Sequence, residues 1–98
     1  MNAMITFEQA RAIALAEIAK ALPKYDFVLL DEETVAKPYG WIFWYNTRKY
    51  LETGNIMDAT PGNAPFVVDN TDGNVHYLST GVPFPEALRT VERSLGVR

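Results

Sequence analysis

The chain contains a single histidine, His76, and this residue is the first candidate for acid-base or metal chemistry. A serine triad needs a histidine that takes the serine proton, and an acid that orients the imidazole; a zinc site needs further imidazole or thiolate ligands. The sequence has no cysteine, which excludes thiol nucleophiles and thiolate ligands. In the expected strand, His76 and Leu78 are two residues apart and point to the same face of the sheet. We therefore predict a structural or surface role for His76.

The stretch DNTDG, residues 69–73, has the composition of a calcium loop. In the EF-hand pattern an aspartate lies five residues before the invariant glycine. The residue at that distance from Gly73 is Val68, which offers no oxygen ligand from its side chain. Asp72 and Gly73 instead carry a strong hairpin signal, with Gly73 in the left-handed position. We therefore predict a tight turn here, and neither a metal nor a cofactor.

Three consecutive acids, Asp31, Glu32 and Glu33, could supply a catalytic pair of carboxylates. Consecutive side chains in a turn diverge and stay hydrated, whereas a catalytic carboxylate needs burial to shift its pKa. No constellation of nucleophile and base remains in the sequence. We predict that the protein is not an enzyme and has no catalytic residue.

The aromatic stretch GWIFWYN, residues 40–46, places apolar side chains on both faces of an expected strand. Trp41, Phe43 and Tyr45 point one way, and Ile42 and Trp44 point the other. This pattern is typical of a central strand, although an uncovered face would form a binding surface. Of the two tryptophans, Trp44 is the candidate for partner binding because no helix obviously covers its face.

Local signals define two helices around the strands. Thr6 and Gln9 form an expected capping box, and a stripe then recurs at helical spacing until Pro23. The stripe consists of Phe7, Ala10, Ile13, Ala14, Glu17, Ile18 and Ala21. The last helix is expected to start at Pro85 or Glu86 and to end at Gly96. The expected strands are 25–30 (extended by 35–36), 40–46, 66–69 and 75–79.

This order of elements predicts an α+β fold. We expect a four-stranded, mostly antiparallel sheet with the N-terminal and C-terminal helices packed on one face, and a long loop (47–64) between strands 2 and 3. The loop is expected to cover the other face with its apolar residues Tyr50, Leu51, Ile56 and Met57. Residues 1–98 should form one domain, with 1–3 as an extension, and PGNAP (61–65) should form a tight turn.

The net charge of −3 argues against a nucleic-acid partner, which would require clustered Lys and Arg. The sequence shows neither a signal peptide nor a membrane span, so we expect a cytoplasmic protein. Residues 50–88 contain five acids and no Lys or Arg. This half of the chain holds most of the candidate partner-binding residues, which are Trp44, Tyr50, Glu52, Asp58, Asp69 and Asp72.

The pieces GWIFWY and GNAPFVVDNTDG, together with the N-terminal ITFEQARAIALAEI, resemble the immunity protein 35 family, also described as YrhB-like domains. The resemblance covers nearly the whole chain. The sequence differs from the family at the end of the hairpin, where it has STG (79–81) and the family has GTA. Membership would imply a small cytoplasmic protein, encoded beside a bacterial polymorphic toxin, that binds and neutralises this toxin without catalysis.

Two interpretations follow for the function. In the first, Glu52, Asp58, Asp69 and Asp72 face a basic surface of a cognate toxin, and complementary charge accelerates binding. The alternative is a stand-alone chaperone-like or ligand-binding housekeeping domain without a toxin partner. An exposed strand edge could also pair two copies into a homodimer. A toxin gene beside this one would favour the first interpretation, and an unrelated operon the second.

Overall fold

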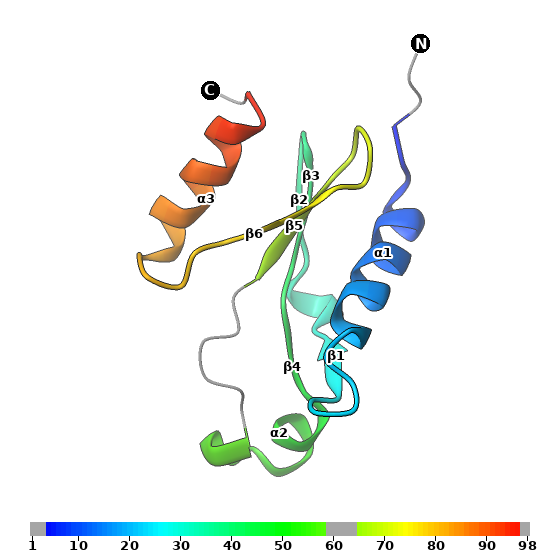
Figure 1. The fold of residues 1–98 in the computed structure, drawn as a ribbon, viewed down its shortest axis with the longest axis vertical. Helices are drawn as coiled ribbons and strands as arrows, with labels where there is room; N and C mark the ends of the chain where they lie inside the picture. Colours follow the sequence, from blue (N-terminus) through cyan, green and yellow to red (C-terminus); the bar gives the residue numbers. More distant parts are fainter. Residues whose placement is uncertain (1–3, 59–64, 97–98) are drawn as a thin grey trace.

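Short strands make up the middle of the chain, between an N-terminal and a C-terminal helix (Figure 1). The structure is a computed structural model that describes residues 4–58 and 65–96. The expectations for residues 1–3 and for the turn at 61–64 lie outside the described residues. The elements are α1 (Phe7–Ala19), β1 (Phe27–Leu29), the 3-10 helix η1 (Asp31–Glu33), β2 (Val35–Lys37), β3 (Gly40–Phe43), β4 (Tyr45–Thr47), α2 (Arg48–Thr53), the 3-10 helix η2 (Ile56–Asp58), β5 (Phe66–Asp69), β6 (Val75–Tyr77) and α3 (Phe84–Ser94).

The predicted capping box starts α1. The Thr6 hydroxyl accepts the Gln9 backbone N–H at 3.1 Å, and the Thr6 N–H donates to the Gln9 side chain at 2.9 Å. These two bonds satisfy donors that the first turn leaves without a helical partner. The alanine-rich stripe beyond the cap, with Ala10 and Ala14 fully buried, lets the helix lie close against the sheet.

The strands form two antiparallel sheets rather than one. The four-stranded sheet has the order β2-β3-β5-β6, and β1 pairs separately with β4. The expected strand 40–46 is therefore divided at Trp44, because its first part pairs with β2 and β5 and its second part pairs with β1. The α+β class and the four-stranded antiparallel sheet are confirmed. The sheet edges are β2 and β6.

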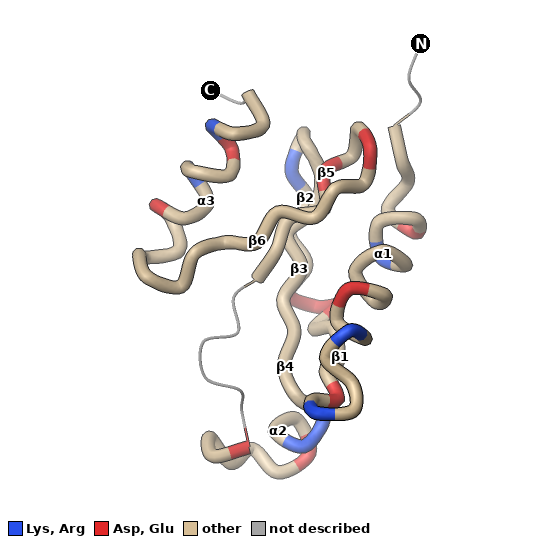
Figure 2. Tube along the Cα trace, in the orientation of Figure 1, with Lys and Arg blue, Asp and Glu red and all other residues tan. Residues whose placement is uncertain are grey.

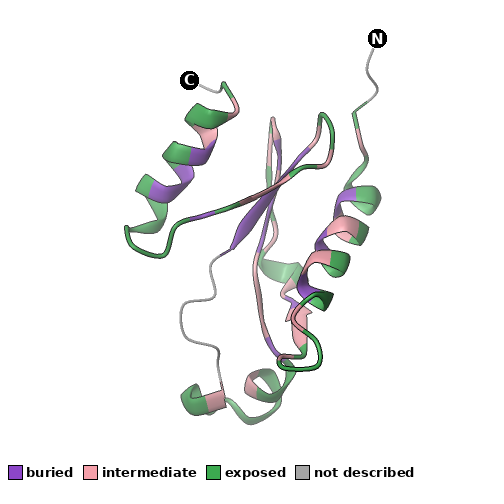
Figure 3. Ribbon diagram, viewed as in Figure 1, coloured by how far each residue is buried: buried purple, intermediate pink, exposed green. Residues whose placement is uncertain are grey.

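The prediction that both helices pack on one face of the sheet is wrong. Helix α1 packs on the face that carries Phe43 and Phe66, and α3 packs on the face of Ile42 and Val67 (Figures 1 and 3). Neighbouring residues of β3 point to opposite faces, and Ile42 and Phe43 are both buried. A strand that is apolar on both faces needs a cover on each, and the two helices provide one each.

The prediction that the segment 47–64 covers the second face is also wrong. Its described part forms α2 and η2, which lie at one end of the molecule (Figure 1), and Leu51, Ile56 and Met57 are 46%, 73% and 83% exposed. Helix α3 already occupies the sheet face that this segment was expected to cover. Helix α2 ends at Gly54, which has the left-handed φ of +68° that is common where a helix ends.

Candidate partner-binding surface

The six residues that the sequence nominated fall into three separate regions. Tyr50, Glu52 and Asp58 belong to α2 and η2, at one end of the molecule. Asp69 and Asp72 belong to the β5–β6 hairpin at the other end (Figure 2), and the longest dimension of the molecule is 46 Å. The structure does not bring these acids together, so a single surface has to be chosen from the geometry of each region.

Trp44 lies on the face of the sheet that α3 covers. The centre of its ring is 5.3 Å from the centre of the Phe84 ring. Trp44 also lines a pocket of about 220 Å³ with Leu78 and Ala87. Trp44 was predicted to bind a partner because its face of the sheet was expected to be uncovered, and this reason does not hold. The residue is half-buried and contributes to the contact between α3 and the sheet.

Asp69 is turned into the protein and holds the hairpin together. Its Oδ1 accepts the backbone N–H groups of Thr71 and Asp72, each at 3.1 Å, and its Oδ2 lies 2.8 Å from Nε2 of His76. The residue is only 6% exposed. Burial favours the neutral acid, but the hydrogen bonds from His76, Asp72 and Thr71 outweigh it and hold the pKa of Asp69 below its ordinary value. His76 thus has the expected structural role.

Asp69→Asn is expected to reduce the free energy of unfolding by about 1–3 kcal/mol at neutral pH, because the amide cannot satisfy all three donors of the native carboxylate. A folded pKa below the unfolded value gives stability that is present above about pH 4 and is lost as the pH falls through the folded pKa. Urea unfolding of both proteins at pH 7 and pH 3 checks this. A difference that is the same at both pH values would contradict it.

Asp72 is exposed, and its two carboxylate oxygens accept the backbone and side-chain N–H groups of Asn74, at 3.1 and 2.9 Å. Beside it lies a pocket of about 340 Å³ that Tyr39 and His76 also line. The Tyr39 hydroxyl donates to Glu92 at 2.6 Å. Within 4–58 and 65–96, no group of three acids or imidazoles could hold a metal ion. The polar groups of the hairpin therefore serve mainly one another.

The α2–η2 end is fixed by hydrogen bonds, although its apolar side chains point outwards. The buried Thr47 hydroxyl caps α2 by accepting the Tyr50 N–H at 3.1 Å, and it donates to the Asp58 carbonyl at 2.6 Å. The Asp58 carboxylate accepts the Thr53 hydroxyl at 2.7 Å and lies 3.5 Å from the ammonium of Lys49. Asp58 is thus used internally, whereas Glu52 is exposed.

A second group of acids borders this end. Between η1 and α2 lies a pocket of about 510 Å³, lined by Leu30 and Leu51 and by the carboxylates of η1. Asp31 is paired with Arg11, and two bonds of 2.9 Å join them. Glu32 and Glu33 are exposed and form no ion pair within the described ranges. The pocket therefore has apolar walls and an acidic border.

The absence of basic residues from positions 50–88 does not give a surface free of positive charge. Arg48 and Lys49 belong to α2 itself (Figure 2), where Arg48 pairs with Asp26 at 2.8 Å. Both cations have acidic partners, since Lys49 faces Asp58. What distinguishes this end is the set of exposed apolar residues, Leu51, Ile56 and Met57, with Glu32, Glu33 and Glu52 as exposed acids. We call these six residues the α2–η2 patch.

Comparison with known proteins gives this arrangement a context. The family profile described as immunity protein 35 matches residues 8–92, from the first turn of α1 to the last turns of α3. The chain belongs to the immunity protein 35 family. The match includes every strand, the hairpin and the α2–η2 patch, so the expected resemblance is confirmed over nearly the whole chain. As an immunity protein 35 member, the chain belongs to a family named for neutralising toxins, typically by binding.

A relative of this immunity protein 35 member is the uncharacterized protein YrhB of Escherichia coli strain K12. The two sequences are 42% identical over 53 residues, which cover 54% of this chain and 56% of the relative. The match thus spans little more than half of the relative's length. No solved structure matches the chain. None of the helices in the described part is both long and apolar enough to cross a membrane.

Proposed function

We propose that this immunity protein 35 member binds and neutralises a cognate bacterial toxin with its α2–η2 patch. Family membership supports the role, and the exposure of the patch supports the location. Ile56 and Met57 are the two most exposed of the large hydrophobic residues in the described part of the chain. Neighbouring exposed apolar side chains with a polar border are characteristic of protein-protein contact sites.

The surrounding carboxylates give the patch a second property. Glu32, Glu33 and Glu52 are exposed and project a negative potential. Complementary charge on a partner raises the association rate more than it changes the final affinity. The apolar residues would therefore determine the affinity, and the acids would accelerate the encounter with a basic toxin surface. Neutralisation by this mechanism needs no chemical step on the immunity protein.

The double variant Ile56→Ser, Met57→Ser is expected to bind the toxin encoded beside this gene at least about tenfold more weakly, since it removes two apolar anchors. Glu52→Lys is expected to slow association about two- to tenfold at low salt and to change dissociation little. Surface plasmon resonance with the purified toxin measures both rates. Asp58 is left unchanged because its carboxylate is bonded within the fold.

Two matched variants on α1 serve as controls. Leu15→Ser changes an apolar residue that is 40% exposed, and Glu8→Lys makes the same charge change as Glu52→Lys in the first turn of α1. Neither should alter the rates appreciably. If the controls weaken binding as much as the patch variants, or if the patch variants bind normally, the proposed surface is wrong.

A further inference from the structure

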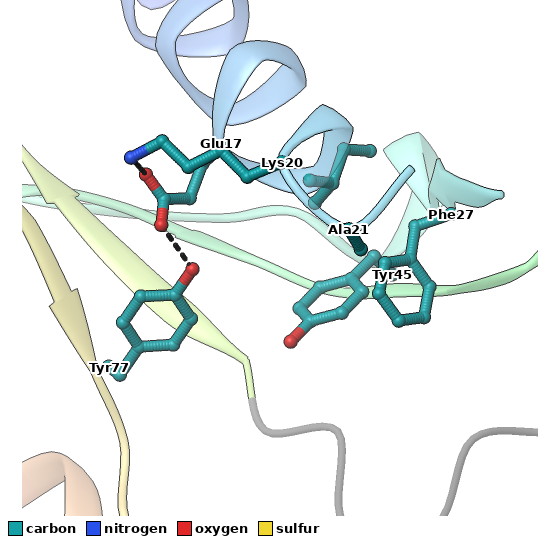
Figure 4. Close-up of a pocket in the computed structure, with 7 residues that line it drawn as sticks. Glu17, Lys20, Ala21, Phe27, Tyr45 and Tyr77 are labelled. Atoms are coloured by element: carbon teal, nitrogen blue, oxygen red, sulfur yellow. Dashed lines mark hydrogen bonds and ion pairs between the residues drawn. The ribbon is translucent and has the colours of Figure 1, made fainter. Parts of the chain in front are cut away.

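A pocket lined by aromatic rings lies between the C-terminal half of α1 and the strands β1, β4 and β6 (Figure 4). Its volume is about 230 Å³, and its lining includes Glu17, Lys20, Phe27, Tyr45 and Tyr77. Figure 4 shows Tyr77 on one side of an open space, Tyr45 and Phe27 on the other, and Glu17 on the helix above. Three aromatic rings, the Glu17 carboxylate and the Lys20 side chain thus line a space of side-chain size.

The buried ring of Phe66 packs against the rings of Tyr45 and Tyr77. Phe66 is fully buried, and its ring centre lies 5.7 Å from that of Tyr45 and 5.5 Å from that of Tyr77. The rings of Phe27 and Tyr45 pack edge to face, with 4.9 Å between their centres. Contacts of this kind restrict where the rings can move, so the pocket is largely formed before any ligand arrives.

Glu17 brings a negative charge to this aromatic surface. Its Oε1 accepts the ammonium of Lys20 at 3.0 Å, and its Oε2 accepts the hydroxyl of Tyr77. These two hydrogen bonds, with the Tyr77 bond the larger cause, hold the pKa of Glu17 below its ordinary value. Burial and the neighbouring Glu17 raise the pKa of Tyr77, so the phenol remains protonated and continues to donate.

Aromatic faces beside a carboxylate form an environment that favours cations, because the ring quadrupole and the negative charge attract the same ligand. We infer that this pocket accepts the cationic side chain of a lysine or an arginine from a partner protein. The partner is taken to be the toxin, and to that extent the inference rests on the proposed function. The incoming cation would lie between the rings of Tyr45 and Tyr77 and would pair with Glu17.

The other classes of occupant fit less well. An anion would lie against the Glu17 carboxylate, although Lys20 also lines the pocket. An apolar side chain would remove water from the carboxylate and add no hydrogen bond to those from Lys20 and Tyr77. A cation already contacts Glu17, since Lys20 is bonded to it. The Lys20 side chain is 73% exposed, so its ammonium can return to water at little cost when a second cation enters.

The test uses small probes and needs no toxin. Nα-acetyl-lysine methylamide and its arginine counterpart are titrated into the full chain, and the tyrosine ring resonances are followed by NMR. Nα-acetyl-norleucine methylamide has a neutral side chain of similar length and serves as the matched control. Saturable shifts of Tyr45 and Tyr77 with both cationic probes, and none with the norleucine probe, are the expected result.

Variants then assign the binding to the pocket. Glu17→Gln and Tyr77→Leu are each expected to weaken binding of the lysine probe at least about threefold. Tyr77→Phe keeps the ring and should retain binding, and Glu8→Gln makes the same charge change as Glu17→Gln outside the pocket. Tyr77 is 53% exposed, so its replacement is compatible with folding, and Glu17→Gln provides an independent test.

Three results would overturn the inference: no saturable shift with either cationic probe, equal binding of the norleucine probe, or unchanged binding by Glu17→Gln. These outcomes do not depend on the α2–η2 patch. Conversely, a failure of Ile56→Ser, Met57→Ser to weaken toxin binding would leave the probe results intact. The two hypotheses can therefore fail separately.

Discussion

Gly40→Ala is expected to lower the free energy of unfolding by about 3 kcal/mol or more, because backbone strain and overpacking both destabilise the folded variant. Gly40 has a φ of +154°, and a Cβ built on it would lie 2.1 Å from the carbonyl oxygen of Val68. That oxygen belongs to the backbone of β5, which pairs with β3 at this position. Neither strand can move without disturbing buried residues on both faces of the sheet, so the clash cannot be relieved locally.

Gly54→Ala is the matched control for this prediction. Gly54 also has a positive φ, +68°, but apart from its two chain neighbours no described residue has an atom within 4 Å of the position that a Cβ would take. Only the cost of the left-handed conformation remains, about 1 kcal/mol. Urea unfolding of the two variants and the parent protein separates strain from overlap. Equal losses for Gly40→Ala and Gly54→Ala would show that the β3–β5 contact is not as close as the structure has it.

Local signals in the sequence were sufficient for many elements of the fold. The Thr6–Gln9 capping box and the left-handed Gly73 (φ +78°) both occur where the sequence predicted them. Each depends on a few neighbouring residues, such as a hydroxyl that can reach a nearby N–H or a glycine that tolerates a positive φ. Such features do not require knowledge of the rest of the chain.

The placement of the helices could not be predicted in the same way. The sequence FVVD predicts a strand, and all four residues of β5 are buried, but the pattern does not reveal which segment covers which face. The apolar residues Leu51, Ile56 and Met57 look the same in the sequence whether they cover a sheet or face water. Because α3 was assigned to the face that α1 covers, these residues were wrongly assigned to the vacant one.

The aromatic pocket was missed for a related reason. Glu17 and Tyr77 are 60 residues apart in the sequence, and only the packing of α1 against the sheet brings them together. One signal was available: Glu17 lies in the stripe that forms the buried face of α1, where an acid needs a partner. The partner is Tyr77, at the exposed edge strand β6, which carries no sequence signal that connects it to α1. The toxin-related function came from the family resemblance and from no individual residue.

Phe66→Ala is expected to lower the free energy of unfolding by about 3–5 kcal/mol. Phe66 is fully buried at the start of β5, and the rings of Phe43, Tyr45 and Tyr77 surround it at 6.0, 5.7 and 5.5 Å. Phe43 and Tyr77 are also its direct neighbours on β3 and β6. Removing the ring therefore leaves a cavity where three strands meet, and small domains have only about 5–15 kcal/mol of stability in total.

Phe84→Ala provides the comparison, because Phe84 is 38% exposed and the Trp44 ring is its one aromatic neighbour in the described structure. Its cost should be about 1 kcal/mol. Urea unfolding followed by tryptophan fluorescence measures both variants, and similar losses would contradict the central position of Phe66. Phe66→Leu retains most of the apolar volume and should fold, but it removes the aromatic support beneath Tyr45 and Tyr77. If the pocket depends on that support, this variant will bind the lysine probe more weakly than the parent while remaining folded.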